Sequence, residues 1–199
     1  GNVTYIGANE ADMLAFDTGP GNALIDDLVY QKTGRACDDN GGLAEQGKVH
    51  DALVQQWLSH PYFAQMPPKS LDRNAWDVLK DVEDLSVEDG AATLTAFTAG
   101  SIARAAQHFP QPVKHWYIAG GGRHNPVLMA MLADKLNKPV GSVDTLGWQG
   151  DFIEAQGFAF LAIRAKLGYP LTWLGTTGVA EPLSGGMEHK AGKEKARTS

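Results

Sequence analysis

Cysteine is almost absent from this sequence, which has one, Cys37, among 199 residues. A single thiol cannot form an internal disulfide or supply a metal site built from several cysteines. The six histidines also lack the spacing that is typical of metal ligands, so we expect no zinc site. A chain so poor in cysteine fits a reducing compartment, and we predict a cytoplasmic protein.

Clusters of lysine and arginine are absent outside the last residues, and the 17 basic side chains are outnumbered by 23 acidic ones, which gives a net charge of -6. Nucleic-acid binding depends on clustered basic side chains that release counterions from phosphates, so we expect no nucleic-acid partner. The longest apolar-rich stretch, residues 158–165, is far shorter than the roughly 20 residues that a membrane-spanning helix needs. No basic-then-apolar leader is evident either, and we expect no membrane contact.

The sequence does contain enough hydrophobic residues, 43%, to bury a core. Two strands are expected near its start, Asn2–Ile6 and Met13–Asp17, close enough together for an antiparallel hairpin. Apolar residues at helical spacing then predict helices over Ala23–Thr33, 45–58 and 86–109, the last capped by the serine at its start. The stretch "HPYFAQMPPKSLDRNAW", between the second and third helices, is rich in proline and aromatic residues and is typical of a packed loop.

From residue 113 onward the pattern changes to strand, glycine turn, helix, strand, turn, helix, which indicates parallel crossover units and an α/β fold. One strand lies in "HWYIAGGG" and precedes a helix over 127–137. Another lies in "PVGSVDTLGWQG" and precedes a helix over 151–167. Residues 184–199 are rich in glycine, lysine and glutamate, and their composition predicts a disordered tail.

Two glycine turns, "DTGPGN" at 17–22 and "GGGRHN" at 120–125, each end a strand and begin a helix, and Asn22 is a good N-cap for the first helix. Helix N-termini present free N–H groups and a positive dipole end, so both turns are candidate anion sites if they face a cleft. Neither matches the spacing of a dinucleotide fingerprint or a P-loop. The alternative, that the glycines only make tight turns, stays open at this stage.

A resemblance is carried by a series of motifs in one order: "FDTGPGN" at 16–22, "HPYF" at 60–63, "PPKS" at 67–70, "GGGRHNPVLM" at 120–129, "GDFIEAQGFAFLA" at 150–162 and "TTGVAEP" at 176–182. Together these resemble the landmarks of the anhydro-N-acetylmuramic acid kinases, over nearly the whole chain. That family is part of the superfamily of sugar kinases, actin and Hsp70 ATPases. The resemblance implies an α/β, ribonuclease-H-like lobe with a mixed sheet flanked by helices.

The family's first phosphate loop and its catalytic aspartate base have no counterpart in this sequence. The resemblance therefore implies that residues 1–183 are the C-terminal lobe of a two-lobe sugar kinase, inactive alone, followed by the disordered tail. The whole enzyme would use ATP to phosphorylate O6 of 1,6-anhydro-N-acetylmuramic acid while water opens the anhydro bridge. The product would be N-acetylmuramic acid 6-phosphate, an intermediate of peptidoglycan recycling.

In this resemblance the lobe holds ATP and Mg²⁺. Asp17 would be the metal-site residue and would contact Mg²⁺ directly or through its waters. The nucleotide would contact residues of both glycine turns: Asp17, Thr18, Gly19, Gly21, Asn22, Gly120, Gly121, Gly122 and Asn125. Glycines 120–122 would let the backbone approach the adenosine closely.

Glu154 is the candidate catalytic residue, on a helix otherwise rich in Phe, Ala, Ile and Leu, with Asp151 three residues before it. One interpretation is structural: Asp151 favours the helix dipole, and Glu154 bonds to a nearby loop N–H. The other is that Glu154 faces the cleft and orients the sugar or the attacking water, with Asp151 also contacting the substrate.

Lys69 and Arg73 are cations in the proline-rich loop and could contact the sugar carboxylate or a phosphate. Members of the family that this sequence resembles usually have "PPKSTGRE" here. The acidic Asp72 of this sequence weakens the case for an anion site. Surface solvation is the alternative for both cations.

The expected partners are ATP, 1,6-anhydro-N-acetylmuramic acid and the missing N-terminal lobe. The apolar faces of the helix over 86–109 and of the last helix also suggest a homodimer. Two alternatives remain: a non-catalytic nucleotide-binding or dimerisation module of the same fold, and a different sugar or acyl kinase of the superfamily.

Overall fold

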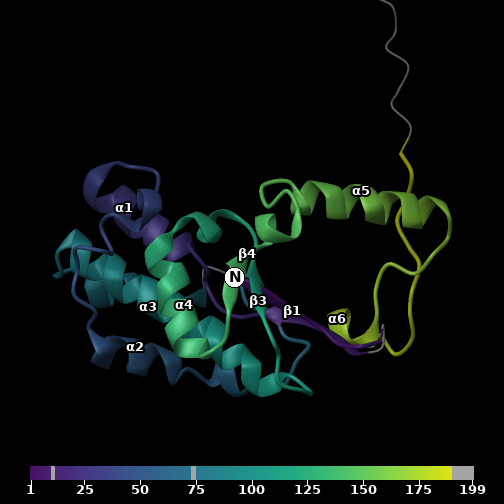
Figure 1. The fold of residues 1–199 in the computed structure, drawn as a ribbon, viewed down its shortest axis with the longest axis horizontal. Helices are drawn as coiled ribbons and strands as arrows, with labels where there is room; N and C mark the ends of the chain where they lie inside the picture. The colour runs from purple at the N-terminus through teal and green to yellow at the C-terminus, as the bar shows by residue number, and fades with distance from the viewer. Residues whose placement is uncertain (10–11, 73–74, 190–199) are drawn as a thin grey trace, which may run out of the picture.

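The computed structural model describes residues 1–9, 12–72 and 75–189 (Figure 1). Its first two strands, β1 (Asn2–Ile6) and β2 (Met13–Asp17), form the predicted antiparallel hairpin, with Asn2 opposite Asp17 and Ile6 opposite Met13. Strands β3 (Trp116–Ile118) and β4 (Val140–Ser142) form a parallel pair, as the crossover pattern predicts. The fold class, α/β, is therefore confirmed.

The strands do not join into the single mixed sheet that the resemblance implies. Within the described part of the chain they make two separate two-stranded sheets, β1–β2 and β3–β4. The Phe109 ring lies 5.0 Å from the ring of Tyr5 on β1 and 5.5 Å from that of Trp116 on β3. Aromatic packing, rather than a ladder of backbone hydrogen bonds, connects the two sheets at this point.

Helix α3 (Val87–Ala105) is the centre of the helical body, and α1 (Ala23–Thr33), α2 (Asp51–Leu58) and α4 (Pro126–Leu136) all pack against it (Figure 1). Its glycines permit this close packing. A Cβ added at Gly90 would lie 2.7 Å from Leu28 Cδ2, and one at Gly100 would lie 2.8 Å from Leu58 Cδ1. Phe97 is fully buried here, with aromatic rings of the loop and of α2 around it.

Two predicted helices are shorter in the structure. The helix expected over 45–58 begins only at Asp51, because the N–H groups of Lys48 and His50 donate to Asp89 and Thr93 of α3 instead of to helical carbonyls. The helix expected over 86–109 ends as an α-helix at residue 105 and continues as the 3₁₀ turn η6 (Ala106–His108). Its predicted serine cap is confirmed, since Ser86 Oγ accepts the Asp89 N–H at 3.0 Å.

The proline-rich stretch is the packed loop that its composition predicts. It contains the short 3₁₀ helix η3 (Pro61–Ala64), and Tyr62, Phe63 and Trp76 are all buried. Their rings contact one another edge-on or tilted, with centroids 5.5–6.0 Å apart. The loop is therefore part of the core.

Helix α5 (Ile153–Lys166) is unlike the others, because it has no buried residue and extends away from the helical body (Figure 1). The short α6 (Leu174–Thr177) packs on β2 so closely that a Cβ added at Gly175 would overlap the Met13 carbonyl oxygen. No helix in the described ranges has both the length and the apolar character needed to cross a membrane. Residues 184–189 are exposed and irregular, and the rest of the expected tail, 190–199, lies outside the described residues.

Candidate functional site

The first glycine turn follows the end of β2, and the packed loop fixes the residue where it begins. Asp17 N–H donates to the Lys69 carbonyl at 3.1 Å, and the Asp17 carbonyl accepts the Tyr62 hydroxyl at 2.7 Å. The Asp17 carboxylate accepts the Leu71 N–H at 3.2 Å through Oδ2. The loop therefore sets both the backbone and the carboxylate of Asp17.

Helix α3 supports the rest of this turn. Thr98 Oγ1 donates to the Gly21 carbonyl at 2.8 Å, and a Cβ added at Gly19 would lie 2.9 Å from Ser101 Oγ. Gly21 has a φ of +62°, which residues with a Cβ rarely adopt. Both glycines are thus required by the local geometry, independently of any ligand. Neither Thr98 nor Ser101 was a candidate from sequence, although two hydroxyls three residues apart on an apolar helix were a signal.

Several polar groups of this turn have no hydrogen-bond partner in the part of the chain that the structure describes. Among the described residues, the N–H groups of Gly19, Gly21 and Asn22 donate to no acceptor. The Thr18 side chain is buried, and its Oγ1 makes no hydrogen bond. Because buried polar groups are nearly always paired, the orphaned hydroxyl and the free N–H groups favour an anionic ligand at this turn.

The second glycine turn follows β3. Gly120 has a φ of +71°, residues Gly121–His124 form the 3₁₀ turn η7, and the Asn125 side chain accepts the Leu128 N–H at 3.0 Å. Asn125 is therefore the N-cap of α4. A Cβ added at Gly120 or Gly121 would meet nothing within 4 Å. The space beside these two glycines is open.

The two turns meet at Asn22. A Cβ added at Gly122 would lie 3.5 Å from both amide atoms of the Asn22 side chain. Asn22 is the N-cap of α1, as predicted, but its side chain makes no capping hydrogen bond and lies beside Gly122 instead. Residues a hundred positions apart in the sequence thus bring the two glycine turns side by side.

Lys69 is turned into the protein. Its Nζ donates to the carbonyls of Tyr62 and Phe63 at 3.1 and 3.3 Å, and lies 3.2 Å from His108 Nε2. Burial lowers the pKa of Lys69, and burial also lowers that of His108. Its contacts give Lys69 a structural role, and its role toward the sugar stays a prediction. Arg73, the other predicted cation, lies outside the described residues.

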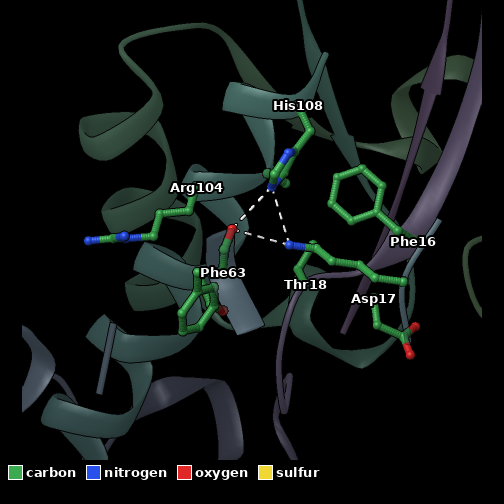
Figure 2. Close-up of a pocket in the computed structure, with 9 residues that line it drawn as sticks. Phe16, Asp17, Thr18, Phe63, Arg104 and His108 are labelled. Atoms are coloured by element: carbon green, nitrogen blue, oxygen red, sulfur yellow. Dashed lines mark hydrogen bonds between the residues drawn. The ribbon is translucent and has the colours of Figure 1, made fainter. Parts of the chain in front are cut away.

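A small pocket lies between the end of β2 and the end of α3 (Figure 2). In this view the end groups of Asp17 and Arg104 point away from His108. The pocket brings Asp17, Thr18 and Lys69 of the predicted site together, and it is lined by Phe16, Asp17, Thr18, Phe63, Lys69, Ser101, Arg104, Ala105 and His108.

Arg123, in the second turn, was not a candidate from sequence. Its side chain is only 3% exposed and donates through Nε to Asp144 at 2.8 Å and through Nη1 to the Gly120 carbonyl at 2.9 Å, while Nη2 lies 2.8 Å from Asp151. Its partners are 21 and 28 residues away in the sequence, so no local pattern could have found them. The hydrogen bond from Arg123 lowers the pKa of Asp151.

Asp151 and Glu154 do not share an environment. Asp151 precedes α5 and is bound by Arg123, with His124 Nε2 at 3.6 Å. Glu154 is exposed on the first turn of α5, with no hydrogen bond or ion pair to any described residue. The structural interpretation, a hydrogen bond from a loop N–H to Glu154, is therefore wrong for the described residues, because the helix that carries Glu154 is itself exposed. The catalytic and substrate-binding roles of Glu154 and Asp151 stay predictions.

The polar groups of the first turn suit an anionic ligand, whereas the described residues do not define a metal site. Among the described residues no group of three His, Cys, Asp or Glu side chains could hold a metal ion. A single carboxylate, Asp17, beside free N–H groups is nevertheless compatible with Mg²⁺, which binds few protein ligands and keeps its remaining positions for waters and phosphates.

This sequence is similar to proteins of a known family. A family model described as "Anhydro-N-acetylmuramic acid kinase" matches residues 1–190. Relatives with this same name include those of Paramagnetospirillum magneticum (51% identical, over 95% of this chain and 54% of the relative) and Rhodospirillum rubrum (51% identical, over 94% and 49%). The relative from Rhizorhabdus wittichii is 47% identical, over 95% of this chain and 52% of its own length. The chain thus spans about half the length of the curated relatives it matches.

Proposed function

The chain belongs to the anhydro-N-acetylmuramic acid kinase family, and from that premise we propose that it forms the nucleotide-binding part of an ATP-dependent sugar kinase. The proposed reaction transfers the γ-phosphoryl group of ATP to O6 of 1,6-anhydro-N-acetylmuramic acid while water adds to the anomeric carbon. The products are ADP and N-acetylmuramic acid 6-phosphate, as in peptidoglycan recycling. The lobe is proposed to be of the ribonuclease-H-like type.

The meeting of the two glycine turns at Asn22 is the observation that carries this proposal. Parallel strands bind ligands at their carboxyl ends, and the second turn stands at that end of β3. The first turn offers its free N–H groups to phosphates, with the buried, unpaired Thr18 hydroxyl in the same turn and Asp17 beside them for Mg²⁺ or its waters. The open side of Gly120 and Gly121 is left for the adenosine.

The proposed reaction divides its requirements between Mg²⁺ and residues of this chain. Phosphoryl transfer depends mainly on positioning and charge neutralisation, which this chain would share with the other half of the family polypeptide. Mg²⁺ would neutralise phosphate charge. Glu154, exposed and unpaired among the described residues, would orient the sugar or the attacking water.

Helix α5 supports the proposal that a second lobe completes the enzyme. Phe158 is 73% exposed and Phe160 61%, and Ile163 on the same helix and Leu167 just after it are also exposed. Large apolar side chains exposed along a helix indicate that another surface covers it. Because the relatives are about twice as long as the part matched here, the remaining half of the family polypeptide is the proposed occupant.

The nucleotide site is tested with Gly121→Ala. Its Cβ would meet nothing within 4 Å in the protein, and Gly121 has no positive φ, so the variant should fold normally and yet obstruct a nucleoside lying on the turn. Gly157→Ala is the matched control, because its Cβ also meets nothing within 4 Å. We expect Mg-ATP affinity, measured by calorimetry, to fall about tenfold or more only in Gly121→Ala. Equal affinities in the two variants would refute nucleoside contact at this turn.

Activity is tested by complementation. The remaining half of the P. magneticum relative, supplied as a separate polypeptide, should allow this chain to phosphorylate 1,6-anhydro-N-acetylmuramic acid, and Glu154→Gln should abolish that activity. Association without activity in the wild-type pair would favour the alternative of a non-catalytic nucleotide-binding module. Self-association of the chain that the added half does not displace would favour a homodimer.

A further inference from the structure

Arg123 binds three acceptors with three different nitrogens. The acceptors are the Gly120 carbonyl, the Asp144 carboxylate and the Asp151 carboxylate, each 2.8 or 2.9 Å away. The side chain is 3% exposed, so its charge is removed from solvent and depends on these partners. A planar guanidinium can satisfy such a set, whereas a lysine ammonium cannot reach three separated acceptors in one plane.

The three acceptors belong to three different segments. Gly120 begins the turn after β3, Asp144 lies in η8 (Val143–Leu146) after β4, and Asp151 lies two residues before α5. Strands β3 and β4 are parallel, with Ile118 opposite Ser142, so both turns leave the same edge of the sheet. Arg123 therefore bridges the carboxyl ends of both strands.

Asp144 completes this connection. It also accepts the Ser142 hydroxyl and, through Oδ1, the Gly150 N–H at 3.0 Å. Gly150 packs directly on the guanidinium, and a Cβ added there would overlap Arg123 Nε. Within the described chain, the polar contacts that join residues 150–151 to the preceding strands run through Asp144, Arg123 and His124.

Helix α5 has no buried residue, so its direction cannot be set by core packing. The polar contacts around Arg123 hold its start, while its last turn contacts the Pro170 carbonyl and Glu188 through Arg164 and Lys166. We propose that Arg123 is a positioning residue, which holds the glycine turn at 120–122 and the start of α5, with Glu154, in one fixed arrangement. This inference rests on the proposed function, because it gives Arg123 the task of aligning the nucleotide turn with the proposed catalytic carboxylate.

The first test does not depend on activity. In Arg123→Lys we expect backbone amide hydrogen exchange to become about tenfold faster both in residues 120–125 and in residues 147–156, because charged hydrogen bonds to both segments are lost. Arg35→Lys is the control, since Arg35 is exposed and its side chain makes no hydrogen bond or ion pair to any described residue. Faster exchange in only one segment, or equally throughout the chain, would overturn the proposal.

A second variant covers the case in which Arg123→Lys does not fold. Asp151→Asn keeps an oxygen acceptor for Nη2 and removes the charge, so residues 147–156 should exchange faster while residues 120–125, still held through the Gly120 carbonyl, change less. If Asp151→Asn leaves both segments as in wild type, the proposal is also overturned.

The kinetic test uses the complemented enzyme. Arg123→Lys should raise the Kd for Mg-ATP and lower kcat, whereas Glu154→Gln should lower kcat and leave that Kd unchanged. A variant of Arg123 that changes neither quantity would contradict the positioning role. If wild-type chain binds no Mg-ATP, the proposed function fails, while the hydrogen-exchange result still decides whether Arg123 couples the two segments.

Discussion

The hydrogen bond from the Tyr62 hydroxyl to the Asp17 carbonyl should contribute measurably to stability. Tyr62 is 1% exposed, and the bond is 2.7 Å long. Tyr62→Phe keeps the ring and leaves the Asp17 carbonyl without this donor, which costs about 1–3 kcal/mol in a buried setting. For a chain of this size a loss of about 2 kcal/mol corresponds to a fall in Tm of about 4–8 °C.

Urea and thermal unfolding of Tyr62→Phe and Tyr30→Phe provide the assay. Tyr30 is 65% exposed, and its hydroxyl makes no hydrogen bond to a described residue, so its variant should unfold within about 0.5 kcal/mol of wild type. Equal stability of the two variants would refute the reasoning.

The titration of Tyr62 offers an independent check on this bond. Burial, and secondarily the nearby charge of Asp17, raise the pKa of Tyr62 to about 12. The hydroxyl therefore remains a donor throughout the neutral and moderately alkaline range. Ultraviolet titration of the tyrosines should show a late component near that pH, which is missing from Tyr62→Phe.

Three further predictions concern the site. Thr18→Val removes an unpaired buried hydroxyl, so it should leave the free energy of unfolding unchanged or higher while weakening Mg-ATP binding. Thr98→Val removes the donor to the Gly21 carbonyl and should lower the free energy of unfolding by about 1–3 kcal/mol. Urea unfolding that ranks the two variants in the reverse order would contradict this. Gly41→Ala should destabilise, because Gly41 has a φ of +70° and the added Cβ would overlap Asn125 Oδ1 at the N-cap of α4; an unchanged Tm would count against it. Hydrogen bonds from Ser142, Arg123 and Gly150 hold the pKa of Asp144 well below its ordinary value of 3.8. The stabilisation that Asp144 contributes is therefore complete above pH 3.8 and is lost as the pH falls below that value. In urea unfolding across this range, the free energy of unfolding should fall less with decreasing pH in Asp144→Asn than in wild type.

Local sequence patterns predicted the helices and strands well where the structure of a segment depends mainly on contacts within that segment. The hairpin, the helix Ala23–Thr33 and the serine cap of α3 are confirmed because turn spacing, apolar periodicity and capping are local signals. The start of α2 was misjudged because α3 side chains take the N–H groups of Lys48 and His50, and this competition between segments leaves no mark in the sequence.

The candidate site was predicted in the same uneven way. Both glycine turns were found from their composition, but their contact through Asn22 depends on how β2, α3 and α4 pack. One interpretation of Glu154 gave it a hydrogen bond to a loop N–H, which a carboxylate on a buried apolar helix would need. An apolar helix such as α5 can also be exposed in one chain when the surface that packs on it belongs to another polypeptide segment. Hydrophobic periodicity alone does not distinguish a buried apolar helix from such an exposed one.

The packing of α6 on β2 has a consequence for handling fragments of this protein. A strand paired on one side presents unpaired N–H and C=O groups on the other, and such an edge can recruit a strand from another molecule. The close approach of Gly175 to the Met13 carbonyl shields part of that edge of β2. Fragments that end before residue 172 would uncover it, so their loss of solubility would reflect intermolecular strand addition rather than failure of the helical body to fold.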